Sequence, residues 1–235
     1  PSGVRLDLAG QVLVGARVVG AAVGDLAVGV LLVEGGLVAV HATAPGGEGD
    51  PELKEGDVVL IDTGCALDGY NADITRTYVF GDPTPEVRRI WELEHAAQAV
   101  AFEAARLGEP CEAVDAAVRA FLKSSGLGPD YQVPGTPHRT GHGIGLDIHE
   151  APNLVRGDQT LLDVGMCFSN EPMIVVPGQF GIRLEDHFHM TEAGANWFTL
   201  PQPSLDEPFR GVAPLAAWRG GPKSVGRRHD HWHLG

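Results

Sequence analysis

The chain has 235 residues, of which 43% are hydrophobic and 20% charged, and its formal net charge is −14. This composition is typical of a globular protein and excludes a fibrous or wholly disordered chain. The acidic balance repels phosphate, so nucleic acid is not expected as a partner. The sequence contains neither a long apolar stretch nor a signal-peptide pattern, which predicts a cytoplasmic protein without membrane contact.

Residues 1–40 contain apolar runs broken by glycines, a pattern that suits strands or buried segments without placing them. From Lys54 the pattern becomes clearer. EGDVVLIDTG predicts a buried strand, ALDG a turn and NADITRTYVF a second strand, so these segments predict a hairpin. Thr84-Pro85-Glu86 then predicts the start of a helix that continues to Gly108, and a second helix is expected over residues 112–125.

A second hairpin is predicted from MCFSNEPMIVV and FGIRLEDHFHMTE, on either side of the turn Pro177-Gly178. The architecture therefore repeats, because each hairpin is expected to carry one carboxylate on each of its strands. Residues 210–235 are rich in Gly and Arg and predict a flexible tail. The three cysteines, Cys65, Cys111 and Cys167, form no CxxC pair or disulfide framework and are assigned to packing.

Four carboxylates lie within otherwise apolar or β-branched strands, where an unpaired charge is costly to bury: Asp62, Asp73, Glu171 and Glu185. Each has a simpler interpretation when taken alone. Asp62 can begin an Asx turn, Asp73 can pair with Arg76, and Glu185 can pair with Arg183.

Taken together with His142, which is flanked by glycines, the four carboxylates suit two divalent cations in an oxygen-rich site. Two neighbouring ions can activate a shared water and polarise a carbonyl, which predicts hydrolysis without a protein nucleophile. The sequence contains no GxSxG motif that would favour a serine hydrolase.

Four segments in this order, LIDTGCALDGYNADITRT, GHGIGLDIHE, SNEPMI and GIRLED, resemble the pita-bread metallopeptidases, which include methionine aminopeptidase, Xaa-Pro aminopeptidase and prolidase. The resemblance implies an α+β pita-bread fold: two pseudo-symmetric halves with a curved antiparallel sheet and outer helices. It makes residues 41–209 the catalytic domain and leaves residues 1–40 as part of that domain or a truncated remnant. It implies two divalent ions, Mn, Co or Zn, with the ligands Asp62, Asp73, His142, Glu171 and Glu185.

By the same resemblance, Glu171 is also the proton shuttle, and His149 contacts the substrate and stabilises the developing oxyanion. His138 and Arg183 resemble the Xaa-Pro branch, where they contact substrate or support the ligands. His41 is expected to bind substrate and to help protonate the leaving nitrogen. Four of these residues also have a simpler structural interpretation. His149 can be a hydrogen-bonded loop residue, His138 a packing residue, Arg183 a salt-bridge partner and His41 a surface residue.

The resulting expectation is a dinuclear peptidase that hydrolyses the Xaa-Pro bond at the N-terminus of short peptides or in dipeptides. Two alternatives stay open. One is a methionine aminopeptidase-like activity, and the other is a pita-bread binding module that has lost catalysis. The resemblance also allows a homodimer.

Overall fold

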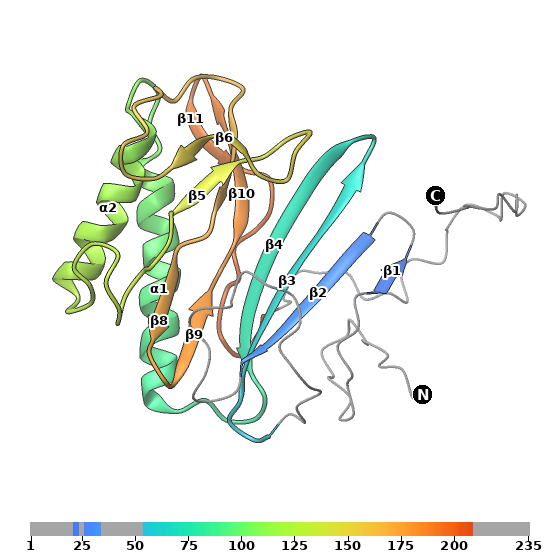
Figure 1. The fold of residues 1–235 in the computed structure, drawn as a ribbon, viewed down its shortest axis with the longest axis vertical. Helices are drawn as coiled ribbons and strands as arrows, with labels where there is room; N and C mark the ends of the chain where they lie inside the picture. The colour runs from blue at the N-terminus through green and yellow to red at the C-terminus, as the bar shows by residue number, and fades with distance from the viewer. Residues whose placement is uncertain (1–20, 24–25, 34–53, 209–235) are drawn as a thin grey trace, which may run out of the picture.

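The computed structural model describes residues 21–23, 26–33 and 54–208 (Figure 1). His41 and the predicted tail at 210–235 therefore lie outside the described residues. The two helices are α1 (Pro85–Ala104) and α2 (Cys111–Ser124). The strands are β1 (Ala21–Val23), β2 (Leu26–Val33), β3 (Val58–Leu67), β4 (Tyr70–Val79), β5 (Gly141–Gly143), β6 (Glu150–Leu154), β7 (Cys167–Asn170), β8 (Met173–Val176), β9 (Phe180–Arg183), β10 (Asp186–Thr191) and β11 (Gly194–Trp197).

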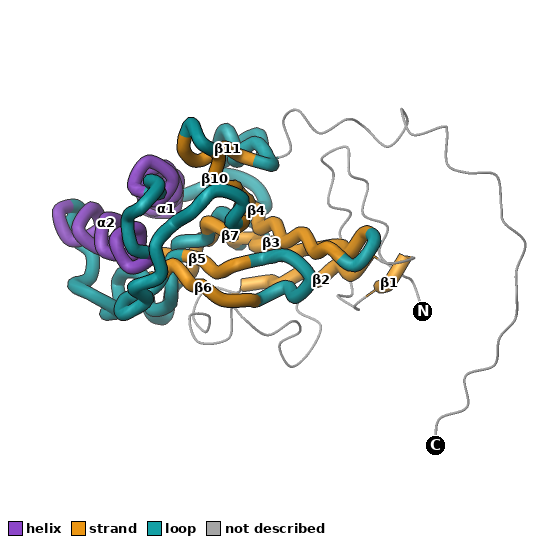
Figure 2. Tube along the Cα trace, turned by 90° about the horizontal axis from the view of Figure 1, so that it is seen from above, coloured by secondary structure: helices purple, strands orange, loops and turns teal. Residues whose placement is uncertain are grey.

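The strands form three antiparallel groups. One sheet has the order β1-β2-β3-β4, a second has the order β11-β10-β7-β5-β6, and β8 pairs with β9. The helices lie side by side on the outer flank of the second sheet, and the β3–β4 hairpin lies on the opposite side of it (Figures 1 and 2). This is the predicted α+β arrangement. Within the described part of the chain, neither helix is long and apolar enough to cross a membrane.

The first predicted hairpin is confirmed as β3 and β4. Its register places Asp62 opposite Thr75 and Gly64 opposite Asp73. Directly opposed residues point to the same face of a sheet, as do residues two apart on one strand. Asp62 and Asp73 therefore share one face on a short diagonal, which explains their spacing of eleven residues.

The two predicted helices are also confirmed. Thr84 caps α1, because its hydroxyl accepts a hydrogen bond from the Val87 N–H at 3.2 Å, and Pro85 occupies the first turn, where it has no hydrogen bond to lose. The buried side chains of α2 recur at helical spacing, with Val114, Val118 and Leu122 facing the core.

The second hairpin differs from the prediction because its ladder is interrupted. Asn170 is opposite Asp186 on one side of the gap, and Met173 is opposite Arg183 on the other, so both sides keep the same register. Glu171 and Glu185 consequently face each other in the gap instead of lying on strands, which corrects the prediction. Pro172 explains part of the interruption, since it has no N–H to donate to the ladder.

The interruption allows the backbone of both glutamates to bond elsewhere. The Glu171 N–H donates to the Thr140 carbonyl at 2.9 Å, near His142. The Glu185 N–H donates to the Thr75 carbonyl at 3.1 Å, so the second hairpin joins the first next to Asp73. The break in the ladder is therefore the feature that brings the halves of the site together.

Buried aromatic side chains support the sheet below this junction. Phe168 and Phe188 stack with ring centroids 5.6 Å apart, and both are fully buried. Phe102 of α1 meets Phe188 edge-on at 5.9 Å and stacks on Trp197 at 4.2 Å. Pairs of this geometry add to the hydrophobic stabilisation, so α1 is fixed firmly to β7, β10 and β11.

Candidate active site

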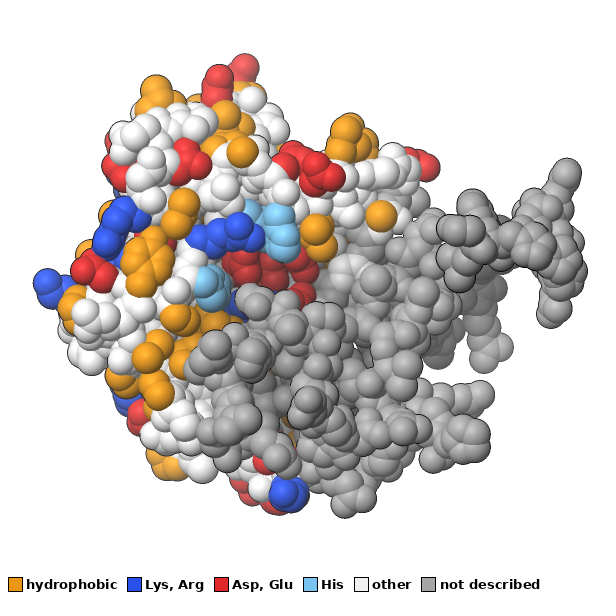
Figure 3. Space-filling view, viewed as in Figure 1, with side chains coloured by type: hydrophobic (Ala, Val, Ile, Leu, Met, Phe, Trp, Pro, Cys, Tyr) orange, Lys and Arg blue, Asp and Glu red, His pale blue; other side chains and the backbone are white. Residues whose placement is uncertain are grey.

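The five predicted ligands converge into two groups that share Glu185. His142, Glu171 and Glu185 form one group, and Asp62, Asp73 and Glu185 form the other, each with ligand atoms within 4.8 Å of one another. Figure 3 shows acidic side chains gathered at the centre of one face, with histidine side chains at their border. The arrangement combines hard oxygen donors with one imidazole, a donor set that suits divalent cations.

His142 is held with one ring nitrogen directed at the carboxylates. Its Nδ1 lies 3.0 Å from the Gly143 carbonyl oxygen, which can only accept, so Nδ1 carries the proton when the ring is neutral. Its Nε2 therefore offers a lone pair, at 3.1 Å from Glu171 Oε1 and 4.0 Å from Glu185 Oε1. A metal-binding histidine is commonly oriented by such a contact to its other nitrogen.

The residues on either side of His142 must be glycines, because the backbone of neighbouring strands lies too close to leave room for a Cβ atom. A Cβ at Gly141 would lie 2.1 Å from the Ser169 carbonyl oxygen, and one at Gly143 would lie 2.6 Å from the Glu150 carbonyl oxygen. Both positions lie between neighbouring strands, where no side chain fits. The two glycines thus allow the strand carrying His142 to enter the sheet beside Glu171.

Two buried polar atoms of the first group lack a hydrogen-bond partner among the described residues: His142 Nε2 and Glu185 Oε1. An unsatisfied buried acceptor is costly. Both atoms offer lone pairs and therefore need a hydrogen-bond donor or a cation. Their acidic neighbours are themselves acceptors and cannot fill this role. A divalent cation satisfies both at once, and on this observation the residues fit a metal centre.

The acidic groups perturb one another strongly. Burial, followed by the charge of Asp62, raises the pKa of Asp73 to about 7. Burial and the charges of Glu171 and Asp73 raise the pKa of Glu185 well above its ordinary value. Burial also opposes ionisation of Glu171, but His142, His138 and Arg183 outweigh it and lower the pKa of that carboxyl to about 2.

These shifts predict how stability depends on pH in metal-free protein. Because the folded-state pKa of Asp73 is raised from 3.8 to about 7, the folded state binds more protons than the unfolded state between these values. Metal-free protein should therefore lose stability as pH rises from about 4 to about 7. Mn, Co or Zn should raise the melting temperature, and more at pH 7.5 than at pH 5, because the ligands must be deprotonated.

Calorimetry of chelator-treated and metal-loaded protein at several pH values measures both effects. Melting that is unchanged by all three metals, with no metal retained on gel filtration, would contradict a metal centre at this position.

Arg183 is buried next to the carboxylates and contacts several of them. Its guanidinium pairs with Asp62 and lies 3.8 Å from Glu171 Oε2. Its Nε donates to the Thr75 hydroxyl at 3.1 Å, and that hydroxyl donates to Glu185 Oε2 at 2.7 Å. Arg183 therefore holds carboxylates of both groups.

Arg76, by contrast, pairs with Asp186 at 2.7 Å. The interpretation of Asp73 as its partner is wrong.

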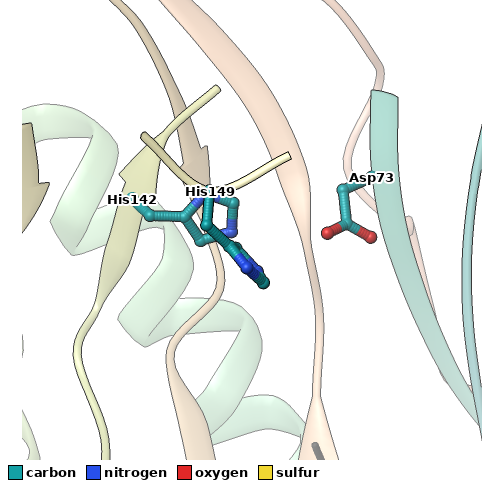
Figure 4. Close-up of side chains that lie close together, drawn as sticks. All are labelled: Asp73, His142 and His149. Carbon is teal, nitrogen blue, oxygen red and sulfur yellow. The ribbon is translucent and has the colours of Figure 1, made fainter. Parts of the chain in front are cut away.

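His149 and His138 lie beside the carboxylates. The rings of His149 and His142 meet edge to face with centroids 4.4 Å apart, and both point toward Asp73 (Figure 4). These three side chains form a further group with ligand atoms within 4.8 Å, although His149 itself is exposed. His138 has a buried Nε2 without a partner among the described residues, and burial lowers the pKa of its imidazole.

The structure adds two side chains that the sequence prediction missed. Thr75 is fully buried and links Arg183 to Glu185. His187 Nε2 accepts the Asp73 N–H at 3.2 Å, and burial, followed by the charge of His142, lowers its pKa to about 4. The only available signal was alternation, since His187 lies two residues beyond Glu185.

Comparisons with known proteins agree with this geometry. The model of metallopeptidase family M24 matches residues 33–192. A probable dipeptidase PepE from Mycobacterium bovis is 47% identical over 150 residues, which cover 63% of this chain and 39% of the relative. An Xaa-Pro dipeptidase from Lactobacillus helveticus is 40% identical over 147 residues, with coverages of 63% and 39%. The chain thus spans about two fifths of these relatives.

The crystal structure of dipeptidase PepE from Mycobacterium ulcerans superimposes with a TM-score of 0.66 at 40% identity, covering 76% of this chain and 47% of that one. The expected pita-bread fold is thereby confirmed, with the Xaa-Pro peptidases as its nearest branch. The family match covers more than half of the chain and includes every predicted ligand position. This chain belongs to metallopeptidase family M24.

Proposed function

We propose that the chain carries the catalytic site of a dinuclear metallopeptidase that hydrolyses the Xaa-Pro bond of dipeptides or short peptides. The observation that carries the proposal is the pair of ligand groups joined at Glu185, with two unsatisfied lone-pair atoms in the first group. With one cation in each group, Asp62, Asp73, His142 and Glu171 would hold the two ions, and Glu185 would contribute to both groups. Four carboxylates and a single imidazole suit Mn, Co or Zn.

When bound, the two cations polarise the scissile carbonyl and lower the pKa of water at the site. Glu171 is assigned as the group that accepts a proton and returns it to the leaving nitrogen, because its carboxylate lies close to both His142 and Arg183 within the first group. His149 donates toward the carbonyl oxygen as negative charge develops. Its exposure lets it reach a substrate that enters from solvent.

One relative supports a preference for proline, and one unpartnered histidine nitrogen supports substrate binding at the site. The relatives include an Xaa-Pro dipeptidase at 40% identity. In addition, the unpartnered Nε2 of His138 offers a polar contact to a substrate next to Glu171, whose charge acts on the imidazole. A binding module without catalysis is the less favoured alternative, because the chain retains a full ligand set together with His149.

Peptide hydrolysis tests the proposal. With Mn or Co present, Ala-Pro and Xaa-Pro-Xaa peptides should be cleaved with a higher kcat/KM than matched peptides with alanine in place of proline. Amino-acid release measured by chromatography checks this. Faster cleavage of Met-Ala peptides would indicate the methionine aminopeptidase alternative, and cleavage of none of them by metal-loaded protein would favour the inactive module.

A further inference from the structure

A buried ion pair on α2 contacts the segment that leads to His142. Asp115 and Arg119 are one helical turn apart, with relative exposures of 1% and 7%. Their contact is bidentate: Nε to Oδ2 is 2.7 Å and Nη2 to Oδ1 is 2.9 Å. Removing two charges from water is costly, so a buried pair of this kind is weak support for stability alone. Its other contacts indicate what the pair does.

The remaining N–H groups of Arg119 donate to the backbone of residues 130–140. They bond the carbonyl oxygens of Asp130 at 2.7 Å, Thr136 at 3.0 Å and His138 at 2.7 Å. The guanidinium also lies 3.3 Å over the Tyr131 ring. All five N–H donors of Arg119 are thus engaged, and three of them bond carbonyls spread over nine residues of this segment.

Asp115 accepts hydrogen bonds from side chains of the same segment. Its carboxylate accepts from the Tyr131 hydroxyl at 3.0 Å and from the Thr140 hydroxyl at 2.8 Å. The segment forms no helix or strand. Within the described residues, its backbone bonds to neighbouring strands and their junctions are confined to Gly135 with Val175 and Thr140 with Leu154 and Glu171, so side-chain contacts supply much of its fixed conformation. Its last residues lead directly to His142, and the Thr140 carbonyl is the one that accepts the Glu171 N–H.

We infer that Arg119 is a positioning residue that sets the His138 imidazole against the substrate, an inference that rests on the proposed peptidase function. The bond to the His138 carbonyl fixes the backbone from which this side chain projects, and the bonds to residues 130 and 136 fix the approach to it. A planar guanidinium can bond a carboxylate and three carbonyls at once. A lysine ammonium has three donors at one point and cannot.

Arg119→Lys is the sharpest test because it keeps the charge beside Asp115. We expect kcat/KM for Xaa-Pro peptides to fall about 10- to 100-fold, the range typical of a displaced substrate contact, with unchanged metal content. In a His138→Ala background the same change should alter kcat/KM by no more than about twofold, because the residue that it positions is gone. Additive losses would overturn the inference.

Arg156→Lys is the matched control. Arg156 also lies over the Tyr131 ring, at 5.2 Å, but it is exposed and pairs with the Asp130 side chain instead of the backbone carbonyls. The Arg156→Lys substitution should leave kcat/KM unchanged. Thr140→Val, which removes a single bond to Asp115, is a second variant with the same expected direction if Arg119→Lys does not fold.

Two further measurements do not depend on turnover. Arg119→Lys should shift the NMR signals of the His138 imidazole and speed amide hydrogen exchange over residues 130–140, while α1 keeps its protection. Unchanged signals and unchanged exchange would overturn the inference even if activity fell. If wild-type protein cleaves no Xaa-Pro peptide, the proposed function fails, and these two measurements still decide whether Arg119 positions His138.

Discussion

Glu185→Gln should remove bound metal from both ligand groups and lower kcat/KM by on the order of 10³ or more. Glu185 is the residue common to the two groups, so its loss weakens both cations at once. Metal ions stabilise transition-state charge by several kcal/mol, and each 1.36 kcal/mol corresponds to a factor of ten in rate. A neutral amide also leaves the Thr75 hydroxyl with a weaker acceptor.

Metal analysis of the purified variant, together with peptide cleavage, checks this result. Glu103→Gln is the matched control, since Glu103 is an exposed residue of α1. A Glu185→Gln protein that keeps its full metal content and near-normal turnover would show that Glu185 is not needed to hold metal in either group.

His149→Ala should keep nearly full metal content while kcat falls by roughly 10²–10³, the usual scale for one oxyanion donor. The interaction is strongest in the transition state, so turnover should change more than binding. Glu171→Gln, in contrast, should reduce metal content and activity together, because that residue both binds metal and moves protons.

The structure makes this comparison decisive, since the His149 ring is near both Asp73 and His142. Inductively coupled plasma analysis and steady-state kinetics on the two variants separate the possibilities. If His149→Ala loses metal as Glu171→Gln does, His149 is a ligand. If its kcat is near normal, it has no catalytic role.

The sequence predicted the first half of the site well, because its signals are local. Strand alternation and a four-residue turn are enough to put Asp62 and Asp73 on one face of a hairpin. The start of α1 followed from Thr84 and Pro85 for the same reason, whereas the helix ends at Ala104, before the predicted end at Gly108. Metal ligation by these carboxylates remains a prediction that the experiments above test.

The parts that could not be predicted depend on contacts between distant segments. The partner of Arg76 is Asp186, 110 residues away, whereas the nearby Asp73 looked equally suitable in sequence. The interruption at Glu171 and Glu185 depends on hydrogen bonds to Thr140 and Thr75, which no periodic pattern encodes. The strand pattern therefore predicted the second hairpin but not the interruption in its ladder at Glu171 and Glu185.

The interrupted hairpin also has a consequence for how the chain tolerates changes in length. Glu171 and Glu185 lie at the base of the β8–β9 arm, and the turn at Gly178 lies at its far end. Insertions in the exposed turn at residues 177–179 would change only the tip, while the pairing of Met173 with Arg183 at the base stays the same. Only the turn of this arm is therefore free to change in length, because the strand residues Ile174 and Ile182 are buried in the core. By contrast, a single residue added within β3 or β4 between Asp62 and Asp73 would turn one of these carboxylates to the opposite face.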